Sequence, residues 1–142
     1  MAYAWSSELE TGNAVIDNQH KQLFVALNAL FDAYRSGGRR QEVERTMEFL
    51  LGYTVKHFAD EEELQRKCDY PDYYAHRQLH IDFKGVAQDL VNKMPQEGPT
   101  DEFITMVYAI VGEWLFKHIK GDDFRMVAYM QAAKRLRSAE AK

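Results

Sequence analysis

The stretch HRQLHIDFKGVAQDLV, residues 76–91, decides the fold of this chain. Its apolar side chains recur every three or four residues, at Leu79, Phe83, Val86 and Leu90. This is the period of one face of an α-helix, because a helix turns once in about 3.6 residues. The stretch therefore predicts an amphipathic helix that buries one side against other parts of the chain.

Three further stretches of helical length show the same period. Their apolar positions are Leu23, Leu27, Leu30, Phe31 and Tyr34; Val43, Met47, Leu50, Leu51 and Phe58; and Phe103, Val107, Ile110, Val111, Trp114 and Leu115. Breaks rich in glycine, proline and aspartate separate the four stretches, at residues 37–38, 69–72 and 95–100. No strand-like alternation of useful length is present. Four amphipathic helices joined by short loops favour an all-α, antiparallel up-down-up-down four-helix bundle.

The 142 residues fit a single domain. We expect an N-terminal arm at residues 1–16, a four-helix bundle at 17–120 and a C-terminal segment at 121–142 with a short helix from about Phe124 to Arg137. Asp17, Asp72 and Thr100 are candidate N-caps, because their side-chain oxygens can accept free backbone N–H groups. Trp5 is expected to pack the arm against the bundle.

Composition excludes several classes of function. The net charge of −4 gives no electrostatic reason for binding nucleic acid or an anionic membrane. The lone cysteine, Cys68, rules out an internal disulfide and a thiolate-rich metal site. No signal sequence and no apolar run of membrane-spanning length is present. We therefore expect a cytoplasmic protein.

The five histidines are the informative residues. They are His20, His57, His76, His80 and His118, and each predicted helix carries at least one of them. Residues four apart on a helix lie about 40° apart around its axis. His76 and His80 can therefore point at one spot, and so can His57 and Glu61.

His118 and Asp123 are five residues apart, a spacing that separates two side chains by about 140° in a regular helix. A distortion after Lys120, at the Gly121-Asp122 step, would be needed to turn Asp123 inward. Asp122 remains a competing candidate at this point.

The helix order brings the candidates to one end of the bundle. His20 lies near the start of its helix and His76 near the start of the third, whereas His57 and His118 lie near the ends of theirs. In an up-down bundle these positions share one level. A buried cluster of five imidazoles and two carboxylates would be costly without a cation, so the pattern predicts a metal centre.

At this point the residues resemble the hemerythrin family, specifically the single-domain bacterial hemerythrins. The resemblance covers nearly the whole chain. The motifs that carry it are Trp5, Thr11–Asn13, Ile16–Lys21, His57–Glu62, Tyr70-Pro71, His76–His80, Trp114–Ile119 and Asp123.

The resemblance implies a non-haem di-iron centre with an oxo or hydroxo bridge. It implies that His76, His80 and His118 bind one iron, that His20 and His57 bind the other, and that Glu61 and Asp123 bridge the two. It further implies reversible O2 binding for carriage, storage or delivery, with O2 bound as hydroperoxide at the five-coordinate iron.

Counting ligands agrees with this interpretation. Two octahedral ions offer twelve positions, and the five imidazoles, two bridging carboxylates and one bridging oxygen fill eleven of them. The set of nitrogen and oxygen ligands without thiolate favours iron.

The candidate lining of the O2 pocket is Phe58, Phe83, Trp114, Leu115 and Ile119. Asp17 and Gln19 are candidates to orient ligands through hydrogen bonds. We expect a monomer, with an oxygen-consuming enzyme as a candidate acceptor of O2.

The chain departs from the family pattern at two positions. Gln65 stands where methionine is common, and Cys68-Asp69 stands where an aromatic residue and glycine are common. Neither position is a ligand, and we expect Gln65 to face solvent.

Two other functions remain open. Ferritin-like oxidases use paired Glu-x-x-His motifs, none of which occurs here, so an oxygen-binding protein is favoured over an enzyme. Peroxidase or nitric oxide chemistry is the enzymatic alternative. The second alternative is an oxygen or redox sensor, which in a chain of this length would act through a partner.

Overall fold

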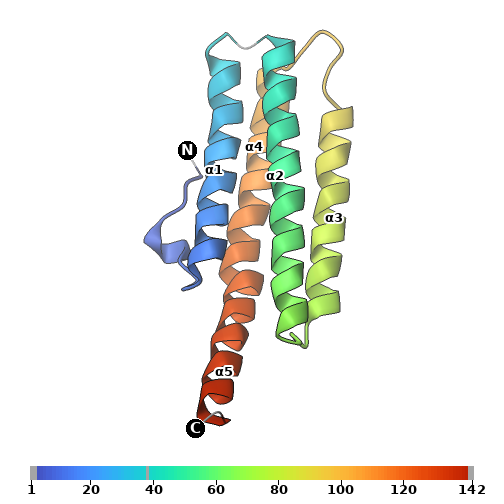
Figure 1. Cartoon of the computed structure of the whole chain (residues 1–142). Helices are drawn as coiled ribbons and strands as arrows, with labels where there is room; N and C mark the ends of the chain where they lie inside the picture. Colours follow the sequence, from blue (N-terminus) through green and yellow to red (C-terminus); the bar gives the residue numbers. More distant parts are fainter. Residues whose placement is uncertain (1–2, 38, 141–142) are drawn as a thin grey trace.

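Four long helices form an antiparallel up-down-up-down bundle, and a fifth extends the last of them past its end (Figure 1). The computed structural model describes residues 3–37 and 39–140. The helices are α1 (Ala14–Arg35), α2 (Arg40–Lys67), α3 (Tyr73–Asn92), α4 (Asp101–His118) and α5 (Phe124–Glu140), with a short 3₁₀ turn η1 (Ser7–Leu9) and a π-helical turn η2 (Ile119–Asp123). The described residues contain no strand, and the predicted fold class is confirmed.

A large apolar core lies between the four helices of the bundle. α1 packs against both α2 and α4, and α2 packs against α3. Buried leucine, valine and phenylalanine side chains fill the space between them, among them Leu27, Leu50, Phe83 and Val107. These residues belong to the apolar faces predicted from the sequence, because a helical repeat of three and four residues forms a single stripe. The stripe is not covered everywhere, since three of its predicted members are exposed: Leu79, Val86 and Ile110.

The first helix begins earlier than predicted. Asn13, rather than Asp17, is its N-cap, and the Asn13 side chain accepts a hydrogen bond from the backbone N–H of Ile16. Residues 14–16 therefore belong to α1 and the arm ends at Asn13. Asp17 instead accepts hydrogen bonds from the backbone N–H groups of Thr11 and Gly12. The sequence did not separate these two acceptors because both lie within one turn of the helix start.

The other two predicted caps differ from each other. Thr100 caps α4, since its side chain accepts a hydrogen bond from the backbone N–H of Phe103. Asp72 stands at the N-cap position of α3 but makes no capping hydrogen bond through its side chain.

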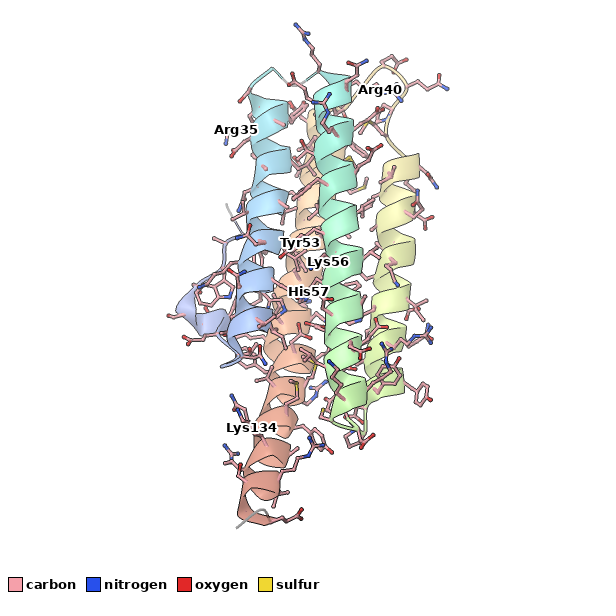
Figure 2. All side chains as sticks on the ribbon, in the orientation of Figure 1. Arg35, Arg40, Tyr53, Lys56, His57 and Lys134 are labelled. Atoms are coloured by element: carbon pink, nitrogen blue, oxygen red, sulfur yellow. The ribbon has the colours of Figure 1, made fainter. Side chains whose placement is uncertain are left out.

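The step at Gly121-Asp122 does not end the fourth helix. α4 passes through η2 directly into α5, which runs to Glu140 rather than to Arg137. A π-turn inserts an extra residue into the helical repeat without stopping it. The last turns of α5 project beyond the bundle, where Lys134 is labelled (Figure 2). Met1, Ala2, Ala141 and Lys142, at the ends of the predicted arm and C-terminal segment, lie outside the described residues, as does Gly38.

The N-terminal arm lies along α1, as Figure 1 shows. Trp5 packs against the main core as expected, and the Nζ atom of Lys21 lies 4.4 Å from the centre of its ring. Tyr3 is held by its backbone carbonyl, which accepts a hydrogen bond of 2.8 Å from the Asn28 side chain. These contacts fix the arm on the same half of the bundle that carries His20.

Within the described part of the chain, no helix is both long and apolar enough to cross a bilayer.

Candidate metal centre

Seven side chains meet inside the bundle at the end where α2 turns into α3. They are the seven ligand candidates of the sequence: His20, His57, Glu61, His76, His80, His118 and Asp123. All are buried, with exposed fractions between 0% and 4%. Four helices and the π-turn each contribute at least one of them, and His57 marks the level of the cluster on α2 in Figure 2. Such a concentration of ionisable groups in a protein interior requires compensating charge.

Glu61 lies between two groups of histidines. Its Oε2 atom is 2.9 Å from Nε2 of His57 and 3.3 Å from Nε2 of His20. Its Oε1 atom is 3.2 Å from Nε2 of His80 and 3.3 Å from Nε2 of His76. Each oxygen of this carboxylate thus faces a different set of imidazoles, which is the arrangement of a bridging ligand.

Asp123 has the same relationship to the two groups. Its Oδ2 atom lies 2.9 Å from Nε2 of His20, whereas its Oδ1 atom lies 3.1 Å from Nε2 of His76 and 3.2 Å from Nε2 of His118. The π-turn between Ile119 and Asp123 makes this possible. It supplies the distortion that the five-residue spacing required, and π-turns are frequently found at functional sites.

The seven residues divide into two sets with metal-ligand spacing. Glu61, His76, His80 and His118 form one set, and the other set is His20, His57, Glu61 and Asp123. Both oxygens of Asp123 are completely buried and have no hydrogen-bond partner of acceptable geometry, although imidazole nitrogens lie close by. The unpartnered oxygens of Asp123 and the imidazole nitrogens beside them fit a cation between them, and the mixed imidazole and carboxylate donors suit iron.

When no cation is present, the two carboxylates of the cluster favour protonated histidines. Burial by itself would lower the pKa of His20, but Asp123 and Glu61 outweigh it and raise this pKa to about 9. The same balance raises the pKa of His76 to about 9. Burial also opposes protonation of His118, but Asp123 and Asp122 raise its pKa to about 10. Burial likewise opposes ionisation of Asp123, yet the neighbouring histidines hold its pKa well below the usual range. The cluster therefore favours positive charge at its centre.

Three of the five imidazoles are oriented from behind by other residues. With Nε2 directed into the cluster, Nδ1 carries the proton and donates it outward. The acceptors are Gln19 for His57 at 2.7 Å, Glu62 for His80 at 2.8 Å and Asp122 for His118 at 2.9 Å. Such hydrogen bonds fix both the tautomer and the ring orientation of a metal-binding histidine.

The sequence analysis predicted only some of the residues that orient the imidazoles. Gln19 was a candidate and does contact His57, whereas Asp17 faces the arm instead. Asp122 was a rival ligand, but it lies outside the cluster. Glu62 was missed, because no spacing along α2 indicates that its side chain reaches a histidine on α3.

Aromatic rings cover one side of the cluster. Phe58 stacks on His80 at 3.8 Å and Trp114 stacks on His118 at 4.3 Å between ring centres. Phe83 in turn stacks on Trp114. Leu115 and Ile119 are buried in the same core, with exposed fractions of 2% and 0%. The three aromatic candidates thus lie beside the three-histidine set, and their role in an O2 pocket stays a prediction.

Gln65 is buried, and the expectation that it faces solvent is wrong. Its exposed fraction is 0%, because a residue four positions after Glu61 lies on the same inward face of α2. Its amide nitrogen lies 2.9 Å from the Met126 sulfur, in a second apolar cluster of Ile16, Tyr70, Met126 and Val127. This cluster closes the end of the bundle beyond the candidate metal ligands.

Comparison with known proteins agrees with the geometry. Residues 11–130 match the family described as Hemerythrin HHE cation binding domain. A bacteriohemerythrin from Stenotrophomonas maltophilia is 38% identical over 120 residues, which cover 84% of this chain and 75% of that protein. A bacteriohemerythrin from Methylococcus capsulatus is 33% identical over 119 residues, or 83% of this chain and 88% of that one.

A solved structure shows the same fold. The crystal structure of a hemerythrin with a leucine-to-tyrosine substitution matches this chain with a TM-score of 0.75 and 31% identity. The match covers 87% of this chain and 94% of that structure. Together with the family match over residues 11–130, it shows that this chain belongs to the hemerythrin family, as a bacterial hemerythrin-like protein.

Proposed function

We propose that this protein binds O2 reversibly at a non-haem di-iron centre, in the service of oxygen carriage, storage or delivery. The observation that carries the proposal is the position of Glu61, whose two oxygens face a group of two histidines and a group of three. This unequal division leaves the two-histidine ion with one fewer protein ligand. An open position on a redox-active ion is where a small molecule binds.

The proposal assigns the ligands as follows. His76, His80 and His118 hold one iron, His20 and His57 hold the other, and Glu61 and Asp123 bridge them together with an oxygen from solvent. The iron pair would supply the open position. It would also supply the two electrons with which O2 is bound in reduced form, as the family resemblance implies. The near-contacts of Asp123 with three imidazoles support its place as the second bridge.

The protein's own residues control the surroundings of this centre. Gln19, Glu62 and Asp122 keep three imidazoles in the tautomer whose Nε2 lone pair points inward. Phe58, Leu115 and Ile119, all at most 2% exposed, exclude water from the core side of the cluster. Exclusion of water favours release of intact O2 over irreversible oxidation, because it withholds protons from the bound ligand. This property suits a binding protein better than an oxidase.

The proposal keeps the cytoplasmic location and the monomeric state expected from the sequence, with an oxygen-consuming enzyme as acceptor. Its test is iron content combined with visible spectra of the loaded protein. We expect two irons per chain and an absorption band that appears with O2 and disappears on deoxygenation through repeated cycles. A lower iron content at full loading would contradict the metal assignment. Rapid turnover of peroxide without a reversible band would indicate the enzymatic alternative.

A further inference from the structure

We infer that Trp114 is the electron-transfer contact between the metal centre and the protein surface, through which a one-electron donor reduces the oxidised iron pair. The inference rests on the proposed di-iron centre and goes beyond it. Release of intact O2 returns the electrons to the irons, but a centre that has been oxidised irreversibly needs a route by which an external donor restores them. The arrangement of aromatic rings around the histidines indicates where that route lies.

Trp114 touches a ligand on one side and approaches the surface on the other. Its indole lies nearly parallel to the His118 imidazole, with 4.3 Å between ring centres and 16° between ring planes. His118 is 4% exposed, whereas Trp114 is only partly buried. A single van der Waals contact therefore separates a partly exposed aromatic ring from an imidazole whose Nε2 points into the metal site.

The other ring stacked on a ligand does not offer such a path. Phe58 lies face to face with His80, with 3.8 Å between centres and 2° between planes, but its exposed fraction is 1%. Tyr70 meets His76 edge-on at 6.4 Å and is itself buried. Among the rings described here, Trp114 combines stacking on a ligand histidine with access to solvent.

The surface around Trp114 is apolar on one side, whereas Lys117, three residues after Trp114, forms an exposed ion pair with Glu113 on the same helix. Ile110 precedes Trp114 by four residues and lies on the same face of α4, with an exposed fraction of 37%. Phe83 of α3 stacks on the indole at 4.0 Å and 16°, and Leu79 and Val86 flank it on that face, 37% and 42% exposed. The exposed apolar side chains on one side of the ring suit close approach of an apolar or aromatic electron donor, because they carry no charge that must be desolvated.

The electron count of the step is simple. The donor loses one electron, and the diferric pair gains it to become one ferric and one ferrous ion. Trp114 serves as a bridge across which the electron tunnels, so that no bond of the protein forms or breaks. A second donor molecule supplies the second electron in the same way.

Diffusing reductants would not test this route. A cleft of about 100 Å³, lined in part by Tyr70, His76, Asp122 and Arg125, gives small molecules a second approach to the ligands. The donor must therefore be tethered. In a Cys68→Ser background, a ruthenium polypyridyl photosensitiser is attached through Ile110→Cys, next to Trp114, or through Phe49→Cys.

The two labelling positions are matched. Ile110 stands eight residues before His118 on α4, and Phe49 stands eight residues before His57 on α2. Both are exposed apolar residues, at 37% and 62%. Eight residues of helix correspond to about 12 Å along the axis in each case. The axial distance to a ligand is thus equal. Tyr53 stands midway between Phe49 and His57, as Trp114 stands midway between Ile110 and His118, but Tyr53 stacks on Phe49 and Trp114 stacks on the histidine. The intended difference between the two labels is therefore a ring stacked on a ligand.

The measurement is the rate at which the diferric visible absorption is lost after a flash, without O2. We expect injection from the Ile110→Cys label to be at least several-fold faster than from the Phe49→Cys label. Trp114→Leu should remove this advantage, and Trp114→Phe, which keeps a stacked ring, should retain most of it. Iron content and the resting spectrum, measured for each variant, show that the centre is intact.

Equal rates from the two labels, or a fast rate that survives Trp114→Leu in the iron-loaded protein, would overturn the inference. A role of Trp114 in packing alone predicts that result. The outcome is independent of O2 binding. A protein that fails to load iron contradicts the proposed function, whereas one that loads iron and accepts electrons equally from both labels contradicts only the role of Trp114.

Discussion

Asp122 and Asp123 are consecutive residues, yet their carboxylates lie on opposite sides of the His118 ring. Asp123 Oδ1 is 3.2 Å from Nε2, inside the cluster, and Asp122 Oδ2 is 2.9 Å from Nδ1, outside it. The π-turn that contains both residues produces this division, because its wider repeat returns the fifth residue after His118 to the inner face. Neighbouring carboxylates therefore have different functions.

The first prediction separates these two functions. Asp123→Asn should lower iron content below two per chain, because it removes the charge of a proposed bridging ligand from a buried site. Asp122→Asn should keep two irons at saturation and weaken iron affinity by about 10–100-fold, the usual effect of losing a partner behind a ligand. Titration with ferrous iron under anaerobic conditions measures both quantities. Iron content that is normal in Asp123→Asn and low in Asp122→Asn would reverse the assignment.

The second prediction concerns Gln19, which accepts a hydrogen bond from Nδ1 of His57 at 2.7 Å and donates one to Asp60 at 2.8 Å. Gln19→Leu keeps the size of the side chain and removes the acceptor. We expect iron affinity of the two-histidine site to fall by about 10–100-fold.

Gln22→Leu is the matched control, since Gln22 lies on the same helix and is exposed. It should leave iron affinity unchanged. An equal loss in both variants would show that the effect comes from α1 in general rather than from the orientation of His57.

The third prediction is a pH dependence of the metal-free protein. Folding raises the pKa of His20 and His76 from 6.5 to about 9 and that of His118 to about 10. A raised pKa contributes stability that is complete below the unfolded value and is lost as pH rises through the folded value. The free energy of unfolding should therefore fall between pH 6.5 and pH 10.

The acid side has the opposite sign. The pKa values of Glu61 and Asp123 are lowered from 4.5 and 3.8, so their contribution is lost as pH falls below that range. Urea unfolding of the metal-free protein, measured from acid pH up to pH 10, checks both the acid and the alkaline decline in stability. Bound metal displaces the protons, so the loaded protein should lack the alkaline decline. A metal-free protein as stable at pH 9 as at pH 6 would contradict the charge balance of the cluster.

The fourth prediction concerns the contact between the arm and the bundle. A Cβ atom at Gly112 of α4 would overlap the Tyr3 ring. Gly112→Ala should therefore displace the arm and lower the free energy of unfolding by about 1–3 kcal/mol. Gly52→Ala is the control, because nothing lies within 4 Å of a Cβ added there. It should stabilise α2 by about 0.5–1 kcal/mol. Equal effects in the two variants would show that the arm is not held against Gly112.

Much of the site follows from local spacing, and the residues that escaped prediction show where that reasoning ends. His76 with His80 and His57 with Glu61 are brought together by the geometry of a single helix, which the sequence contains in full. Glu62 contacts His80 across two helices, and Gln65 is buried against Met126. The rotation of one helix against another sets such contacts, and that rotation depends on packing of the whole core.

The sequence by itself determined the helical bundle, the collection of five histidines at one of its ends and the family resemblance, because helix periodicity and helix order are local properties. Residue spacing left both Asp122 and Asp123 open, and the resemblance implied Asp123. Only the tertiary structure showed how Asp123 reaches the cluster, and that each oxygen of Glu61 faces a different group of histidines. The physical reason is that carboxylates between helices are placed by the register and distortion of the helices that carry them. In this chain, a π-turn of five residues makes that difference.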